Sequence, residues 1–223
     1  AVAVGFALAV TLPRAGNIGG DGFMLVHIAA TGEDVAFDFR SVAPRAATLA
    51  MFVDDKGQET ARASRGYRAS AVPGTVAGLA AAHKRFGKLP WKDVVAPAIR
   101  LAADGVVLTP DEAFVFGWAR ERMTESVAGT RAFYKPDGSL YAPGETLRQP
   151  DLAWSLRQIA DHGADAFYTG EIAKRIAADM KAHDGLITLE DLAAYKVAVR
   201  KPLVGTYRGY TVMTMPPASA GGP

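Results

Sequence analysis

The chain is organised around residues 13–44, which read PRAGNIGGDGFMLVHIAATGEDVAFDFRSVAP. A glycine-rich turn (residues 16–22) comes first, and an apolar run (residues 23–30) follows it. A short turn that contains Gly32 then leads into a second apolar run (residues 35–39), which ends at Arg40. Two β-type runs joined by a short glycine-containing turn predict a β-hairpin. We therefore expect Arg40 at the point where the second strand leaves the sheet.

Arg40 has two interpretations at this stage. A guanidinium presents a rigid fork of donors that matches a carboxylate in bidentate fashion, so an arginine at a strand end can bind a carboxylate ligand. Most arginines, however, lie on the surface and pair with a nearby acid, and spacing alone favours this second interpretation.

The glycine-rich turn contains four glycines in seven residues, at positions 16, 19, 20 and 22. This density indicates unusual backbone dihedral angles or close approach of the backbone to another group. A phosphate cradle is a weaker alternative, because the order matches neither G-x-x-x-x-G-K-[ST] nor a strand followed by G-x-G-x-x-G and a helix. The element expected after this turn is a strand.

Length and composition indicate a globular protein. The 223 residues suffice for one domain with a real core, so we predict a single domain over residues 1–223. A charged fraction of 22% and a hydrophobic fraction of 49% are typical of soluble proteins. The net charge of +2 is too small to argue for nucleic acid or an anionic membrane. Without cysteine, the chain has no disulfide, thiol nucleophile or thiolate metal site.

The remaining elements follow from periodicity and end signals. The opening AVAVGFALAV has no basic segment before it and is too short to span a bilayer, so neither a signal-peptide core nor a membrane span is indicated. Phe114, Phe116 and Trp118 are expected in the core. Arg62, Arg65 and Arg68 form a basic cluster that indicates a solvated loop more than an anion site. Helices are expected at residues 75–86, 91–103, 109–127, 151–162 and 171–183, with a short helix after a capping box at residues 188–191 and a final hairpin at residues 197–207 and 210–215.

The order of strands, a long helical middle and strands again predicts an α+β fold. No internal repeat or clear linker interrupts this order. Pro202 places the first strand of the final hairpin at a sheet edge or a bulge.

The run AGNIGGDGFMLV, followed by FDFRSVAP, resembles the large-subunit region of γ-glutamyltranspeptidases, which are N-terminal-nucleophile hydrolases. The resemblance continues in VPGTVAG (residues 72–78), GLITLEDLAAY (residues 185–195), YRGY (residues 207–210) and the closing PPASAGG (residues 216–222). It implies a four-layer αββα sandwich, of which this chain would supply one outer helical layer and part of the sheets. It also implies that the opening apolar run is the end of a buried helix that leads into the glycine-rich turn.

The resemblance also implies acyl transfer from γ-glutamyl amides such as glutathione to water, an amino acid or a peptide. The nucleophile would be an N-terminal threonine on a small subunit that follows downstream and forms a heterodimer with this chain. No catalytic residue is expected here, because Ala1 has no nucleophilic side chain and no threonine has the T-[TS]-H cleavage context. No metal or cofactor is implied, and the location implied is periplasmic or secreted.

The residue matched to the substrate's α-carboxylate clamp is Arg40, and Gly19, Gly20 and Gly22 match a structural turn near the site. Three departures accompany the resemblance. Ser41 stands where the family usually has an acid, which would help orient the guanidinium or bear on the substrate amine. Asp21 interrupts a run of four glycines, and Ala220 stands where the closing motif PP-x-S-S-G-G has its second serine. These departures leave open a cephalosporin-acylase-like amidase of the same fold. They also leave open a non-catalytic paralogue that binds a small carboxylate through Arg40.

Overall fold

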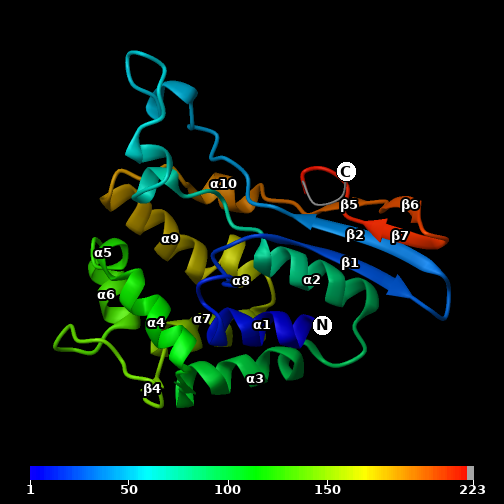
Figure 1. Ribbon diagram of the computed structural model, residues 1–223, viewed down its shortest axis with the longest axis horizontal. Helices are drawn as coiled ribbons and strands as arrows, with labels where there is room; N and C mark the ends of the chain where they lie inside the picture. The colour runs from blue at the N-terminus through cyan, green and yellow to red at the C-terminus, as the bar shows by residue number, and fades with distance from the viewer. Residues whose placement is uncertain (220–223) are drawn as a thin grey trace. The chain divides into compact units, whose positions relative to one another are not determined.

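The structure is a computed structural model that describes residues 1–219, and these fold into two compact units (Figure 1). Apart from the first two residues, one unit contains residues 3–17 and 91–160, and the other contains residues 18–90 and those from 161 onward. A single domain over the whole chain stays a prediction. Residues 220–222 of the closing PPASAGG match lie outside the described residues.

The second unit is built on the predicted hairpin. Strand β1 (Gly22–Ile28) pairs antiparallel with β2 (Glu33–Phe39), in a register that runs from Gly22 opposite Phe39 to Ile28 opposite Glu33. Gly32 has a φ of 68° in the connecting turn, a conformation that favours glycine. Strand β5 (Ala198–Arg200) pairs with the other edge of β2, so the sheet order is β1-β2-β5. The hairpin prediction is confirmed, and β2 becomes the central strand.

Helix α2 (Thr75–Phe86) packs against this sheet, as Figure 1 shows. It begins where the backbone N–H groups of Gly74 and Thr75 donate to the carbonyl oxygen of Gly20 (2.9 and 3.1 Å). Its Ala82 joins Val35, Phe37 and Phe39 of β2 in one buried cluster. The helix has the bounds predicted from the sequence, and its N-terminus is anchored on the glycine-rich turn.

The C-terminal part of this unit adds α8 (Asp165–Tyr168), α9 (Glu171–Ala182) and α10 (Leu189–Ala193). Thr188 and Asp191 form the predicted capping box at the start of α10. Strands β6 (Leu203–Tyr207) and β7 (Tyr210–Thr214) form a two-stranded ribbon across the predicted Arg208-Gly209 turn. The strand predicted over residues 197–207 is divided into β5 and β6 around Pro202, which has no N–H to donate. Three short 3-10 turns, η1 (Leu49–Met51), η2 (Ala61–Ala63) and η3 (Tyr67–Ala69), lie in the segment between β2 and α2.

The first unit is mostly helical. It comprises α1 (Val2–Thr11), α3 (Trp91–Asp104), α4 (Pro110–Trp118), α5 (Arg120–Met123), α6 (Val127–Phe133) and α7 (Pro150–His162), with a short β3 (Val106–Val107) paired to β4 (Thr146–Leu147). Within it, Phe6 of α1 is fully buried and meets the Trp91 ring edge-on at 5.5 Å. The opening apolar run is therefore a helix with a buried face, as predicted.

The helix predicted over residues 109–127 is wrong in extent. The predicted Thr109 cap is present, but the segment divides into α4, α5 and α6, and Ser126 supplies a new side-chain cap that accepts from Gly129 N. Of the three aromatics expected in the core, only Phe116 is buried, while Phe114 and Trp118 are 71% and 75% exposed. Phe114 and Trp118 are four residues apart and share one helix face, whereas Phe116 points to the opposite side.

Candidate functional site

Arg40 follows the last residue of β2, as the hairpin prediction required. Its Nε lies 3.3 Å from Oδ2 of Asp21, and its Cζ lies 5.9 Å from the centre of the Phe23 ring. The side chain is 56% exposed. Within residues 1–219, its guanidinium makes no hydrogen bond to the protein. The terminal edge of the fork is therefore available to a bidentate carboxylate.

Hydrogen bonds fix the backbone of Arg40 on both sides. Its N–H donates to Oδ1 of Asp38 (3.2 Å), and its carbonyl oxygen accepts from the Tyr195 hydroxyl (2.9 Å). Asp38 is buried, and its other oxygen accepts from Nε of Arg200 on β5 (2.9 Å). A buried carboxylate is tolerated when it is paired and hydrogen-bonded in this way. The result is an exposed side chain on a tightly held backbone, which suits a binding group.

Tyr195 acts as a neutral hydrogen-bond donor. Burial, together with the nearby carboxylates of Asp38 and Asp21, raises its pKa to about 12. The phenol therefore keeps its proton across the physiological range and continues to hold the carbonyl of Arg40. Its ring stacks on Tyr168 at 5.5 Å, and the hydroxyl of Tyr168 in turn donates to the carbonyl oxygen of Pro73 (2.9 Å).

Among the glycines of the turn, close packing explains Gly22. None of the four has a φ in the left-handed region, so unusual dihedral angles are not the reason for them. A Cβ on Gly22 would lie 2.9 Å from a ring atom of Phe39, and the Gly20 carbonyl oxygen holds the start of α2. Gly19 belongs to the same turn. The glycine-rich turn thus precedes a strand, and it lacks the helix that a phosphate-binding loop requires.

Two further glycines position the site from α2. A Cβ on Gly74 would lie 1.9 Å from the carbonyl oxygen of Phe39 and 2.1 Å from the Tyr195 hydroxyl oxygen. A Cβ on Gly78 would lie 2.1 Å from Cγ of Phe39. Phe39 precedes Arg40, so these glycines set how closely α2 approaches the strand end that carries the arginine.

The sequence analysis missed the supporting residues around Arg40. Asp38 carried a usable signal, because an acid inside an otherwise apolar strand needs a buried partner. Arg200 and Tyr195 carried none, since they lie 160 and 155 residues from Arg40 along the chain. Asp21 was noted only as a departure from the glycine run, whereas it is the side chain paired with Arg40.

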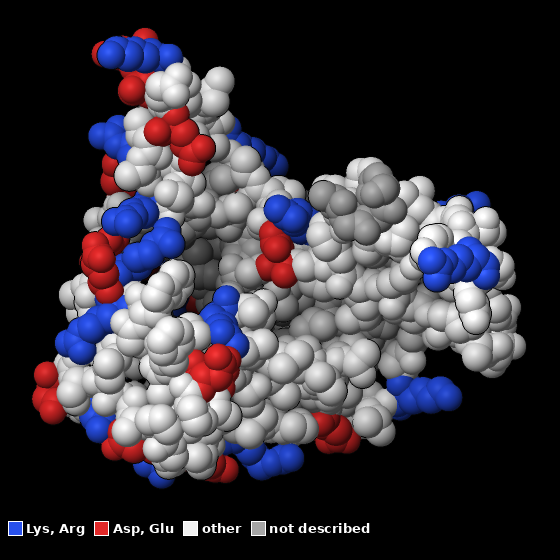
Figure 2. Space-filling view, viewed as in Figure 1, with Lys and Arg blue, Asp and Glu red and all other residues white. Residues whose placement is uncertain are grey.

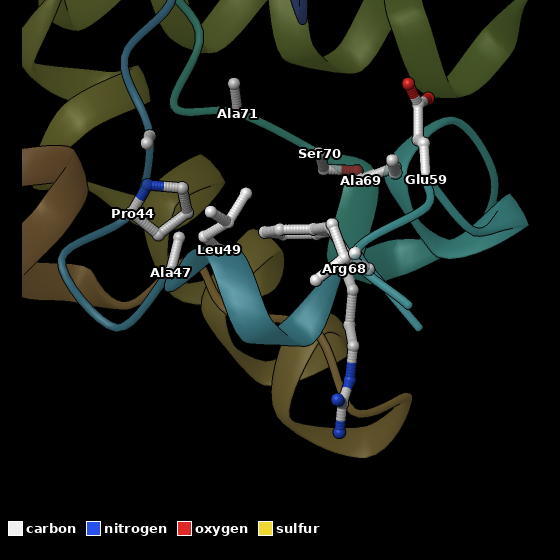
Figure 3. Close-up of a pocket in the computed structure, with 13 residues that line it drawn as sticks. Pro44, Ala47, Leu49, Glu59, Arg68, Ala69, Ser70 and Ala71 are labelled. Carbon is white, nitrogen blue, oxygen red and sulfur yellow. The ribbon is translucent and has the colours of Figure 1, made fainter. Parts of the chain in front are cut away.

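A separate pocket of about 410 Å³ lies in the segment between β2 and α2 (Figure 3). Pro44, Ala47, Leu49 and Ala71 are among the mainly apolar residues that line it, and none of the residues around Arg40 does. The aliphatic part of the Arg68 side chain lines the pocket, and its guanidinium extends away from the pocket to pair with Asp184. This ion pair agrees with a solvated surface loop.

Charge and metal-ligand patterns reveal no second kind of site. Basic and acidic side chains are interspersed on the face shown in Figure 2, with no broad area of one sign. Residues 1–219 contain no group of three or more histidine, aspartate or glutamate side chains placed to hold a metal ion. Among these same residues, none of the helices has both the length and the apolar character needed to cross a bilayer.

The sequence matches the family model described as Gamma-glutamyltranspeptidase over residues 1–222. The chain belongs to the γ-glutamyltranspeptidase family. The glutathione hydrolase proenzyme of Escherichia coli (strain K12) is 46% identical over 226 residues, covering all of this chain and 38% of that protein. This chain therefore spans well under half of that family member.

Solved structures of the family and of its fold agree with this assignment. The crystal structure of Helicobacter pylori γ-glutamyltranspeptidase superimposes with a TM-score of 0.96 at 46% identity, covering 99% of this chain and 63% of that one. Cephalosporin acylase from Bacillus halodurans superimposes with a TM-score of 0.87 at 34% identity, covering 97% of this chain and 41% of that one. The α+β prediction is confirmed, and the chain is part of an N-terminal-nucleophile hydrolase fold.

Proposed function

We propose that this chain is the large-subunit portion of an enzyme that cleaves γ-glutamyl amides of the glutathione class and transfers the γ-glutamyl group to water, an amino acid or a peptide. The observation that carries the proposal is the terminal edge of the Arg40 guanidinium, which donates no hydrogen bond to residues 1–219 and lies at the end of β2 on a backbone fixed by Asp38 and Tyr195. This group is suited to bind the α-carboxylate of the γ-glutamyl moiety.

Acyl transfer needs a nucleophile, a base and oxyanion donors besides such a clamp. In the proposed enzyme these come from a small subunit of the same precursor, whose N-terminal threonine attacks the amide carbonyl. The threonine's own α-amino group takes the hydroxyl proton, since its ordinary pKa lies near neutrality. The role of Arg40 is to hold the substrate so that the γ-carbonyl meets this nucleophile. We place the assembled enzyme in the periplasm or outside the cell.

An apolar surface supports the presence of a covering partner. The β6–β7 ribbon exposes several large apolar and aromatic side chains: Leu203, Val204, Tyr207, Tyr210 and Val212. Exposed apolar patches of this kind mark interaction surfaces. The isolated segment is expected to bind a hydrophobic dye or to aggregate, whereas the assembled protein binds much less dye. A monomeric segment that unfolds cooperatively and binds no dye would contradict this.

The test uses the full-length protein. Intact-mass analysis and N-terminal sequencing should find a companion chain that begins with threonine, and the material should hydrolyse γ-glutamyl-p-nitroanilide. Arg40→Ala should then lower kcat/KM, chiefly through KM, by about thirty- to a thousand-fold, which corresponds to roughly 2–4 kcal/mol for a lost charged hydrogen-bond partner. Arg40→Lys should recover only part of this, because a point charge lacks the planar fork.

Arg131→Ala serves as the matched control, since Arg131 is an exposed arginine paired with Asp151 (2.8 Å) in the other unit. It should leave kcat/KM unchanged. An Arg40→Ala enzyme with unaltered kcat/KM would reject the clamp, and the absence of any threonine-started chain would leave only a carboxylate-binding paralogue.

A second candidate is a cephalosporin-acylase-like amidase, which the similarity to the Bacillus halodurans structure favours. A glutaryl group has the same carboxylate as a γ-glutamyl group but lacks the α-amino group. The wild-type kcat/KM values for γ-glutamyl-p-nitroanilide and glutaryl-p-nitroanilide distinguish the two candidates. A clear preference for the glutaryl compound would favour the acylase.

A further inference from the structure

Asp21 contacts both residues that follow β2. Its Oδ2 lies 3.3 Å from Nε of Arg40 and accepts hydrogen bonds from the backbone N–H (2.9 Å) and the hydroxyl (2.5 Å) of Ser41. The β1–β2 register explains this meeting, because Gly22 pairs with Phe39 and the next positions outward are 21 and 40. Asp21 therefore joins the start of β1 to the exit of β2.

The contact with Arg40 is made through Nε. An acid on Nε leaves the Nη1 and Nη2 edge of the guanidinium for a ligand, and within residues 1–219 nothing hydrogen-bonds to that edge. The Phe23 ring, 5.9 Å from Cζ, flanks the same guanidinium. Asp21 and Phe23 together limit the rotamers of a side chain that is otherwise more than half exposed.

Two of the departures from the resembled pattern, Ser41 and Asp21, lie in contact. Ser41 replaces the usual acid and donates its hydroxyl to the carboxylate of Asp21, which replaces a glycine. A glutamate at position 41 would bring a second carboxylate against Asp21 in place of a donor, and like charges at this distance repel. The donor at position 41 and the carboxylate at position 21 are therefore chemically complementary.

We propose that Asp21 is the positioning residue for Arg40, and that it takes over from residue 41 the task of orienting the guanidinium toward a substrate carboxylate. This inference rests on the proposed function. It deepens that function by assigning carboxylate recognition to a pair, Asp21 and Arg40. Asp21 itself acts through Arg40 and does not contact the substrate.

The experiment is a set of variants of the full-length enzyme assayed on γ-glutamyl- and glutaryl-p-nitroanilide. Asp21→Asn keeps the size and an acceptor for Ser41 but removes the charge, so KM should rise about five-fold. Because both substrates present the same carboxylate to Arg40, KM should rise equally for both, with kcat within about two-fold. Asp151→Asn, which breaks the exposed ion pair with Arg131, should change neither KM.

A swap provides the second arm. Asp21→Gly and Ser41→Glu should each raise KM, and the double variant Asp21→Gly/Ser41→Glu should return KM to within about three-fold of wild type. Such non-additivity is the mark of two residues acting on one group. A purely structural role for Asp21 would instead lower thermal stability in every variant without this recovery.

Three results would overturn the inference. They are an unchanged KM in Asp21→Asn, a rise in KM for the γ-glutamyl compound alone, and a double variant no better than the single ones. The second result would mean that Asp21 binds the substrate ammonium group. If the wild-type protein turns over neither compound, the proposed function fails. The Asp21–Arg40 pair can then still be tested by calorimetry of glutarate binding to wild type, Arg40→Ala and Asp21→Asn. In that assay equal affinity for all three proteins would overturn it.

Discussion

The substitution Gly78→Ala has two opposing effects on the stability of the protein. Inside a helix, alanine is favoured over glycine by about 0.5–1 kcal/mol, so helix propensity alone predicts stabilisation. The new Cβ, however, would lie 2.1 Å from Cγ, 2.3 Å from Cδ1 and 2.7 Å from Cβ of the buried Phe39. Overpacking of a buried ring costs about 1–3 kcal/mol, so the net expectation is a destabilisation of about 1–2 kcal/mol.

Gly117→Ala is the matched control for this prediction. Gly117 also lies in a helix, but its added Cβ would meet only Leu140 Cδ1, at an ordinary contact distance of 3.6 Å. The same substitution should therefore stabilise the protein by up to about 1 kcal/mol. Calorimetric unfolding of the full-length protein should give a lower Tm for Gly78→Ala and an equal or higher Tm for Gly117→Ala.

The clash also has a functional consequence, because Phe39 precedes Arg40 in the chain. Displacement of the Phe39 ring should move the strand end and raise KM for a γ-glutamyl substrate, while Gly117→Ala leaves KM unchanged. A Gly78→Ala protein as stable as wild type, with an unaltered KM, would refute the argument that α2 approaches β2 through this glycine.

Two other residues give predictions that depend on hydrogen bonds and pH. Tyr195→Phe removes the donor to the Arg40 carbonyl, so it should cost about 0.5–1.5 kcal/mol of stability and raise KM several-fold. The pKa of Tyr195 is about 12 in the folded chain, against about 10 in the unfolded chain. Its contribution to the free energy of unfolding should therefore fall between about pH 10 and 12, and this fall should be absent in Tyr195→Phe. An equal alkaline loss of stability in both proteins would contradict this prediction. For Asp191, burial raises the pKa, but hydrogen bonds from the N–H groups of Arg45 and Thr188 and from the Thr188 hydroxyl outweigh it and lower the pKa. The ionised carboxylate of Asp191 therefore stabilises the fold above its ordinary pKa, and this stabilisation is lost as pH falls. Asp191→Asn should be less stable at pH 7 and should lose less stability on acidification, as measured by urea unfolding from pH 3 to 7.

Local signals in the sequence were sufficient for the hairpin, α2 and the capped start of α10. Alternating apolar runs, Gly32 in the turn and the Thr188 capping box each act within a few residues, so their consequences can be read without the rest of the chain. Arg40 could be placed at the strand exit for the same reason. Its proposed role as a carboxylate clamp came from the family resemblance, because an isolated arginine carries no such information.

The parts that the sequence did not reveal depend on long-range contacts. Arg200 meets Asp38 because β5 pairs with β2, and Tyr195, which follows α10, meets the Arg40 carbonyl only in the folded chain. The predicted helix is interrupted after Trp118, and Ser126 caps the start of a new helix. Hydrophobic periodicity alone does not predict this interruption. Asp21 shows a third limit, since its effect depends on the strand register that brings it opposite Arg40.

The proposed function depends on Arg40 binding the α-carboxylate of the substrate. The most direct measurement compares kcat/KM for γ-glutamyl-p-nitroanilide with that for 4-aminobutyryl-p-nitroanilide, which lacks only this carboxylate, in the wild-type full-length enzyme and in Arg40→Ala. The account predicts that wild type prefers the carboxylate-bearing substrate by about thirty- to a thousand-fold and that Arg40→Ala loses nearly all of this preference. A preference of the same size in both enzymes would show that the carboxylate is bound elsewhere.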